Sequence, residues 1–318
     1  MAPLYAISIA LTTRARYVVV LMFEEAQLYS PVTENEDGTV TVELAGDHPG
    51  ACDPVYRERR NHIAARAVAW RPGEPTPRIE YSEAEHEVWR IVSRELAPKH
   101  ERYACREFRE AAAALALPTD HIPQLDEVTA GLEPLTGWSY HCAAGLVPLR
   151  DFLGALGDRI FHSTQYIRHG AMPLYTPEPD LIHEVIGHGN LLASPRFAAI
   201  KREAGLAAQR VETDEALQFL ADVFWFTIEF GVLREDGEVR AYGAGILSSY
   251  GEIEEFRGAD LRPLDLLEMG TLEYDITHYQ PVLFCADGMG ALEDVVGGFF
   301  AAFDDDTPAR LRSVAHAT

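Results

Sequence analysis

Two histidines and a glutamate interrupt an otherwise apolar helical stretch, His183-Glu184-Val185-Ile186-Gly187-His188. At about 100° per residue, a spacing of four leaves two helical side chains roughly 40° apart, whereas the spacing of five found here leaves them about 140° apart. Both imidazoles can therefore reach one metal ion only if the helix ends or distorts between them. Gly187 is the residue that would permit this change. The alternative is a pair of half-buried histidines with local hydrogen bonds.

A carboxylate occurs in a second apolar run, Phe224-Trp225-Phe226-Thr227-Ile228-Glu229-Phe230. Burying an unpaired carboxylate costs several kcal/mol, so an arginine, a proton or a metal ion must neutralise Glu229. Two histidines from one helix and a carboxylate from another form the facial triad of non-haem iron oxygenases, which leaves coordination positions open. The alternative is an ion pair between Glu229 and an arginine, for which Arg159 or Arg168 could serve.

A polar, aromatic and proline-rich loop over residues 162–180 precedes the histidine-bearing helix. Pro177 and Pro179 stiffen this approach, and Asp180 can then cap the helix that carries His183. An arginine in such a loop is a natural bidentate partner for a substrate carboxylate, which makes Arg168 a candidate. A structural salt bridge of Arg168 is the alternative.

Composition narrows the classes of partner. The 318 residues carry a net charge of −23, which disfavours nucleic acid and anionic membrane surfaces but is compatible with a small zwitterionic substrate. The four cysteines lie far apart, so neither a disulfide scaffold nor a cysteine zinc site is expected. Arginines interrupt the apolar start of the chain, and the apolar runs are too short for a membrane span. We therefore expect a cytoplasmic protein.

Hydrophobic periodicity predicts a mostly α fold with minor β, built as one catalytic domain over residues 46–303. Residues 1–45 form a short β-prone extension, and residues 304–318 form a C-terminal tail. We expect helices at 53–69, 82–97, 103–116, 151–161, 181–192 and 213–232, and strands at 17–23, 39–44 and 238–242. The Pro- and Gly-punctuated segment 118–148 has no predicted element.

Several long motifs in the same order resemble the tetrahydropterin-dependent aromatic amino acid hydroxylases. They are Pro177-Glu178-Pro179-Asp180-Leu181-Ile182-His183-Glu184-Val185-Ile186-Gly187-His188, then Trp225-Phe226-Thr227-Ile228-Glu229-Phe230-Gly231, then Tyr242-Gly243-Ala244-Gly245-Ile246-Leu247-Ser248-Ser249. Weaker matches extend the similarity over roughly residues 45–300, including Tyr279-Gln280-Pro281. The pattern is more similar to the animal-type catalytic domain than to the shorter bacterial phenylalanine hydroxylases. Among the members of the family, it most resembles phenylalanine hydroxylase.

The resemblance assigns a role to each matching position. It implies that Fe(II) is held by His183, His188 and Glu229, with His162 near the iron. It implies an amino acid site made by Arg168, Thr176 and Ser248, with Trp225 and Phe230 lining the pocket for the ring. It implies that Phe152 stacks on the pterin, with Gly145, Val147, Glu184 and Ala221 beside it.

As an activity, the resemblance implies a monooxygenase that uses O2, Fe(II) and tetrahydrobiopterin or a related pterin. One oxygen atom would go to the pterin and the other to the ring. L-Phenylalanine is the expected substrate and tyrosine the expected product. Tryptophan enzymes tend to carry Phe at the position of Trp225, and tyrosine enzymes carry Asp at the position of Ile276. The same chemistry on tryptophan or tyrosine, and meta-hydroxylation of phenylalanine, are the alternatives.

Two other classes compete with this interpretation. One is a zinc hydrolase with Glu184 as general base, which the five-residue histidine spacing disfavours. The other is a binding protein without catalysis, which the intact ligand set and Arg168 disfavour. The animal enzymes' regulatory domain and C-terminal tetramerisation helix have no counterpart in the chain, so we expect a monomer or dimer.

Overall fold

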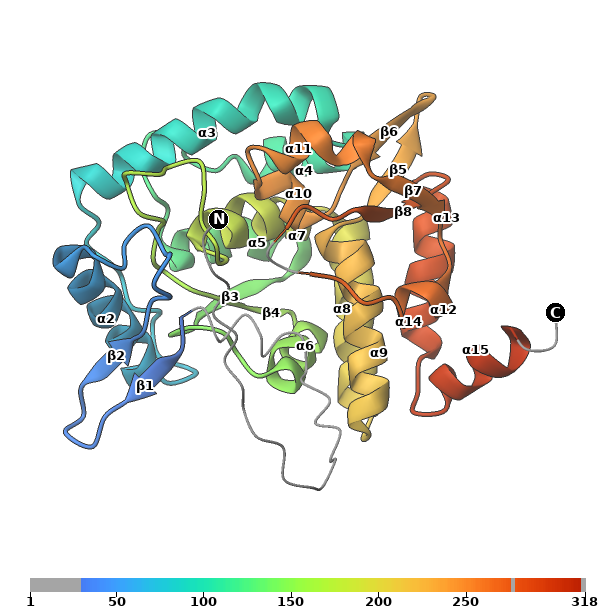
Figure 1. Ribbon diagram of the computed structural model, residues 1–318, viewed down its shortest axis with the longest axis horizontal. Helices are drawn as coiled ribbons and strands as arrows, with labels where there is room; N and C mark the ends of the chain where they lie inside the picture. The colour runs from blue at the N-terminus through green and yellow to red at the C-terminus, as the bar shows by residue number, and fades with distance from the viewer. Residues whose placement is uncertain (1–29, 276–277, 316–318) are drawn as a thin grey trace, which may run out of the picture.

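The computed structural model describes residues 30–275 and 278–315, so the strand expected at 17–23 and the side chain of Ile276 lie outside the described residues (Figure 1). The described part is mostly helical with minor β structure, as the sequence predicts, and its strands form three small sheets. The longer helices are α2 (Pro54–Ala69), α3 (Glu83–Tyr103), α4 (Arg106–Leu115), α5 (Leu125–Thr136), α6 (Leu149–Gly157), α8 (Pro195–Arg210), α9 (Asp214–Phe224) and α15 (Thr307–Ala315). Shorter helices are α7 (Asn190–Leu192), α10 (Ala244–Ser248), α11 (Glu252–Glu255), α12 (Leu266–Met269), α13 (Met289–Leu292) and α14 (Gly298–Ala302).

The three sheets are small and differ in topology. Strands β1 (Val32–Glu34) and β2 (Val40–Val42) form an antiparallel hairpin, whereas β3 (Ser139–Cys142) and β4 (Ile160–Ser163) pair in parallel. Strands β5 (Val232–Glu235), β6 (Glu238–Ala241), β7 (Asp260–Pro263) and β8 (Val282–Ala286) form one sheet in the order β6-β5-β8-β7. No helix in the described residues is both long and apolar enough to cross a membrane.

Side-chain caps explain where several helices begin. The Asp53 carboxylate accepts hydrogen bonds from the first turn of α2, and Ser82 forms a reciprocal capping box with Glu85 at the start of α3. The Ser194 hydroxyl group accepts hydrogen bonds from the first turn of α8, with Pro195 in the first helical position. These residues satisfy backbone N–H groups that have no partner inside the helix.

Sequence periodicity misplaced several element boundaries. Helix α3 continues through Pro98 to Tyr103, so the next helix begins only at Arg106. The segment expected to lack regular structure contains α5 and β3, because Pro134 lies in the last turn of α5 and Gly137 adopts the left-handed conformation that ends it. The helix expected over 151–161 ends at Gly157 and is followed by β4.

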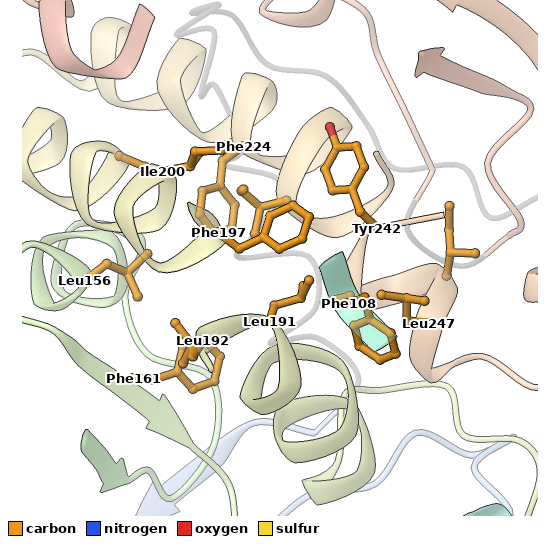
Figure 2. Packing of buried hydrophobic residues seen from close by; sticks show 14 of the residues in the cluster. Phe108, Leu156, Phe161, Leu191, Leu192, Phe197, Ile200, Phe224, Tyr242 and Leu247 are labelled. Atoms are coloured by element: carbon orange, nitrogen blue, oxygen red, sulfur yellow. The ribbon is translucent and has the colours of Figure 1, made fainter. Parts of the chain in front are cut away.

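Helices α8 and α9 run side by side and carry much of the hydrophobic core (Figure 1). Figure 2 shows Phe197, Phe224 and Leu191 directed into this cluster from α8, α9 and α7. Helix α6 approaches α8 so closely that a Cβ added to Gly205 would lie 2.0 Å from the backbone nitrogen of Gly157. The resulting rigid layer supports the segments that carry the predicted metal ligands.

Candidate metal and pterin site

The helix that carries His183 and His188 is wound as a π-helical turn over His183–Gly189. Its backbone hydrogen bonds join residues five apart, so side chains at this spacing lie on the same side of the turn. The two Nε2 atoms are 3.0 Å apart and the rings are nearly perpendicular, at 89°. The distortion required by the sequence spacing is therefore present, in the form of a wide turn.

Gly187 has a different role from the one the sequence suggested. It is not among the described residues with left-handed backbone angles. A Cβ at this position would lie 2.9 Å from the carbonyl oxygen of Ala244, at the start of α10. Gly187 therefore permits α10 to pack closely against the histidine-bearing turn.

Glu229 completes a buried cluster from the end of a second π-helical turn, Trp225–Glu229. Its Oε1 is 3.2 Å from His188 Nε2, and its Oε2 is 3.5 Å from His183 Nε2. Two donors that each lie about 2.1 Å from one ion at a right angle are about 3.0 Å apart, so these separations fit three adjacent positions around one metal ion. Glu229 thus faces the two histidines, while Arg168 pairs with another carboxylate.

The second nitrogen of each histidine also has a partner. Ser248 donates its hydroxyl hydrogen to the carbonyl of Ala244 at 2.8 Å, so its oxygen accepts from Nδ1–H of His183 at 2.9 Å. Lys201 Nζ lies 2.8 Å from Nδ1 of His188. Ser248, expected at the amino acid site, therefore orients a histidine, whereas Lys201 had no role predicted from the sequence.

Burial controls the protonation of the cluster. It lowers the pKa of His183 to about 4 and the pKa of His188 well below its usual value. It raises the pKa of Glu229, against the opposing charges of His183 and Lys201. Neutral imidazoles keep Nε2 available as a metal ligand, and a divalent ion would compensate the buried carboxylate.

An open cavity lies beside this cluster, and Glu184 of the histidine-bearing turn forms part of its wall. The predicted pterin and iron neighbours Gly145, Val147, Phe152, His162 and Glu184 line it. Ala221 is fully buried in α9 and is not part of the cavity wall. Leu146, between Gly145 and Val147, also lines the cavity, and the wall residues that sequence reasoning missed are Ser30, Ala143, Thr164, Tyr166, Glu178 and Pro179.

Two wall residues are fixed by a buried ion pair. Arg60 donates to Glu178 at 2.5 Å, and its guanidinium lies 3.3 Å from the centre of the Tyr166 ring. Burial alone would raise the pKa of Glu178, but hydrogen bonding with His48 and the charge of Arg60 hold it at about 2. The cavity wall therefore carries an ionised carboxylate that is already paired with Arg60.

Arg168 and Asp180 form a second buried pair. Nε and Nη2 of Arg168 donate to the two carboxylate oxygens at 2.9 and 2.7 Å, and the Arg168 backbone N–H donates to the same group. The expectation that the Asp180 side chain caps the following helix was wrong, because this carboxylate is already occupied by Arg168. The salt bridge considered from the sequence is thus present, and Nη1 forms no hydrogen bond with the described residues.

The predicted ring pocket has more aromatic members than expected. Trp225 lies 4.6 Å from both Phe230 and Tyr274, and it is stacked on Tyr274 at 12°. Its Nε1–H donates to Gln280 at 3.3 Å. The Oγ1 of Thr176 is buried and has no hydrogen-bond partner among the described residues. Tyr274 and Gln280 were not assigned from the sequence, although Gln280 belongs to the Tyr-Gln-Pro motif.

The family described as biopterin-dependent aromatic amino acid hydroxylases matches residues 33–310. The chain belongs to the biopterin-dependent aromatic amino acid hydroxylases. A Streptomyces coeruleorubidus protein named phenylalanine 3-hydroxylase is 51% identical over 268 residues, which cover 84% of this chain and 96% of that protein. Human phenylalanine-4-hydroxylase is 41% identical, and the match covers 81% of this chain but 58% of the human protein.

Solved structures of the same kind share the fold. Phenylalanine hydroxylase from Colwellia psychrerythraea has a TM-score of 0.68 at 33% identity, covering 76% of this chain and 91% of that one. The Chromobacterium violaceum enzyme, solved with bound iron (III) and 7,8-dihydrobiopterin, has a TM-score of 0.68 at 28% identity and covers 75% and 90% of the two chains. Membership of this family makes the chain a pterin-dependent aromatic amino acid monooxygenase and excludes the zinc hydrolase alternative.

Proposed function

We propose that this hydroxylase binds iron through His183, His188 and Glu229 and hydroxylates the ring of L-phenylalanine. The buried three-donor cluster beside the cavity carries this proposal, because its donor atoms all lie within 4.8 Å of one another. Two neutral imidazoles and one carboxylate are the donor set of non-haem Fe(II) oxygenases. Bound iron would supply, together with a reduced pterin, the activation of O2.

The protein's own groups would hold both organic ligands beside the metal. Phe152 is half-buried in the cavity wall, where its ring can stack on a pterin, and Gly145, Val147 and Glu184 line the same wall. The remaining Nη1 of Arg168 would bind the substrate carboxylate, with Thr176 offering its hydroxyl. The aromatic rings of Trp225 and Phe230 would hold the substrate ring and exclude water. Contacts of Ala221 with the pterin and of Ser248 with the amino acid stay predictions.

Phenylalanine is favoured as the substrate because a relative that is 51% identical over nearly its whole length is named for phenylalanine. A tyrosine 3-monooxygenase from Drosophila melanogaster is also 43% identical, so the comparison alone does not separate the two amino acids. The described lining of the ring pocket is aromatic, which suits an unsubstituted ring. Pockets without a partner for a hydroxyl group reject it only modestly, so slower turnover of tyrosine is expected.

The position of the new hydroxyl group has two candidates. The sequence interpretation expected the para product, tyrosine, and the 4-hydroxylases at 41–43% identity support that outcome. The phenylalanine 3-hydroxylase at 51% identity supports the meta carbon, and it matches over nearly its whole length. We therefore favour meta-hydroxylation, with para-hydroxylation as the second candidate.

A reconstitution assay tests this function. Purified protein loaded with Fe(II) should convert L-phenylalanine to a tyrosine isomer in the presence of O2 and tetrahydrobiopterin, with the isomer identified by chromatography. His183→Ala, His188→Ala and Glu229→Ala should each lose bound iron and activity. Full activity with zinc, or turnover without pterin, would contradict the proposal. Comparing kcat/KM for the three aromatic amino acids would establish the preference, and light scattering would check the expected monomer or dimer.

A further inference from the structure

Lysine is rare in this chain, and one of its two lysines lies directly behind the candidate metal site. Of the 27 basic residues, only Lys99 and Lys201 are lysines. Lys99 is also largely buried, but it pairs with Glu254 at 2.8 Å and lies 3.7 Å from the centre of the Tyr250 ring. Lys201 is 0% exposed, in α8. Its position therefore calls for an explanation other than solubility.

The Lys201 amine contacts a histidine rather than a carboxylate. Nζ lies 2.8 Å from Nδ1 of His188, and it has no carboxylate within ion-pair distance among the described residues. Phe161 covers the same region, 5.6 Å from Nζ and 4.7 Å from the His188 ring. The His188 ring is thus held at its edge by the amine and on one side by an aromatic ring.

This contact resembles the one made to the other histidine. Ser248 holds Nδ1 of His183, and Lys201 holds Nδ1 of His188, so both Nε2 atoms face Glu229. Partners that accept a hydrogen bond from the second ring nitrogen fix the orientation of a metal-bound imidazole, and their loss weakens metal binding about 10- to 100-fold. Lys201 takes this role as a neutral amine, whose lone pair accepts the hydrogen of Nδ1–H of His188. A wholly buried amine is a poor source of stability, because removing it from water is unfavourable. The contact with His188 and the unfavourable burial of the amine both indicate that Lys201 serves metal binding rather than stability.

We propose that Lys201 is a positioning residue that holds the His188 ring so that Nε2 points at the metal. This inference rests on the proposed ligand set of His183, His188 and Glu229. It deepens that proposal, because it adds a contact from a different helix, 13 residues beyond His188 in the chain. Lys201 does not touch the metal in this arrangement, so it acts only through the histidine.

Cobalt binding tests the role directly. Lys201→Met keeps the length of the side chain and removes the nitrogen. In titration calorimetry with Co(II) alone, this variant should bind the metal at least tenfold more weakly than the natural sequence. Its Co(II) absorption spectrum should change in band position, which a general loss of packing would not produce. The melting temperature without metal should be unchanged or higher. Lys99→Met is the matched control, and its Co(II) affinity and spectrum should be unchanged.

Two further measurements separate the ways in which the inference can fail. If His188→Ala loses Co(II) binding while Lys201→Met keeps the affinity and spectrum of the natural sequence, the Lys201 role is wrong and the metal site stands. If His188→Ala binds Co(II) normally, both proposals fall. Should Lys201→Met not fold, the natural protein labelled with 15N-lysine has only two side-chain Nζ signals. Adding Zn(II) should shift the Lys201 signal and not that of Lys99, and an unshifted pair would overturn the role.

Discussion

The guanidinium of Arg168 donates two parallel hydrogen bonds to the carboxylate of Asp180, and both side chains are almost completely buried. The pair joins the loop that carries Arg168 to the residue directly before the helix that leads into the candidate metal turn. A guanidinium fixed in this way presents its remaining Nη1 in one direction. Asp180 is therefore expected to orient the proposed carboxylate-binding group without touching the substrate.

Breaking the Arg168–Asp180 pair should affect both stability and substrate binding. Asp180→Asn leaves the buried guanidinium without its counter-charge, which is expected to destabilise the fold by about 3–5 kcal/mol. KM for phenylalanine should rise more than kcat falls, because Arg168 loses its orientation. Thermal unfolding and steady-state kinetics would measure these effects. Asp126→Asn removes an exposed partner of Arg78 and should change stability by less than about 1 kcal/mol. Equal effects of the two substitutions would contradict this account.

Phe152 should contribute to pterin affinity by stacking. Its ring meets Phe161 and Phe224 edge to face, at centroid distances of 5.8 and 6.5 Å, and it also lines the cavity. Phe152→Ala should weaken pterin binding by about 0.5–1.5 kcal/mol beyond the loss of contact area. Phe152→Leu retains most of that area, so the difference between the two variants in calorimetry isolates the ring. Unchanged affinity in both variants would place the pterin elsewhere.

Asp222 should make stability depend on pH. Burial raises the pKa of its carboxyl group from an ordinary value of 3.8 to about 7, although hydrogen bonds from Gln218 and Tyr274 oppose the shift. The folded state therefore holds the proton more tightly than the unfolded state. Its contribution to stability is fully present below about pH 4 and is lost as the pH rises toward 7.

Comparison with Asp222→Asn isolates that effect. The free energy of unfolding of the natural sequence, relative to this variant, should decrease between about pH 4 and pH 7, by at most roughly 4 kcal/mol. Denaturant unfolding at several pH values would measure the difference. A difference that stays constant across this range would show that Asp222 titrates normally.

Gly243 should tolerate no side chain, because it lies against the backbone of a candidate metal ligand. A Cβ at this position would be 2.4 Å from the carbonyl oxygen of Glu229 and 2.5 Å from the backbone nitrogen of Gly231. Gly243→Ala should therefore displace Glu229 and destabilise the fold by at least about 1–3 kcal/mol. Gly290→Ala is the control, since nothing lies within 4 Å of its added Cβ. Metal content and thermal unfolding would distinguish the two variants.

The candidate site was predicted best where residue types themselves carry the chemistry. His183, His188 and Glu229 stand out because polar ligands in apolar helices need a partner, and the structure brings them together. Ser248 was assigned to the amino acid site, and in the structure its hydroxyl group contacts His183. Lys201 gives no local signal, because its relation to His188 arises only when α8 packs against the histidine-bearing turn.

The boundaries of several helices and strands could not be predicted from local sequence patterns. Helix α5 contains Gly131 and Pro134, which sequence reasoning takes as breaks, yet the helix accommodates both. Pro98 is likewise tolerated inside α3. Strand β4 follows α6 so closely that its apolar residues read as a continuation of the helix. In these cases tertiary packing overrides local propensity.

The wide turn at His183–Gly189 has a consequence for how metal motifs are compared between proteins. An i to i+5 hydrogen bond encloses one more residue than an α-helical one, so His183 and His188 occupy a spatial relation that an ordinary helix gives to residues four apart. A search that counts residues treats the two spacings as unrelated. Aligning ligands by their position around the helix axis, after omitting the extra residue of the wide turn, would group such sites by geometry.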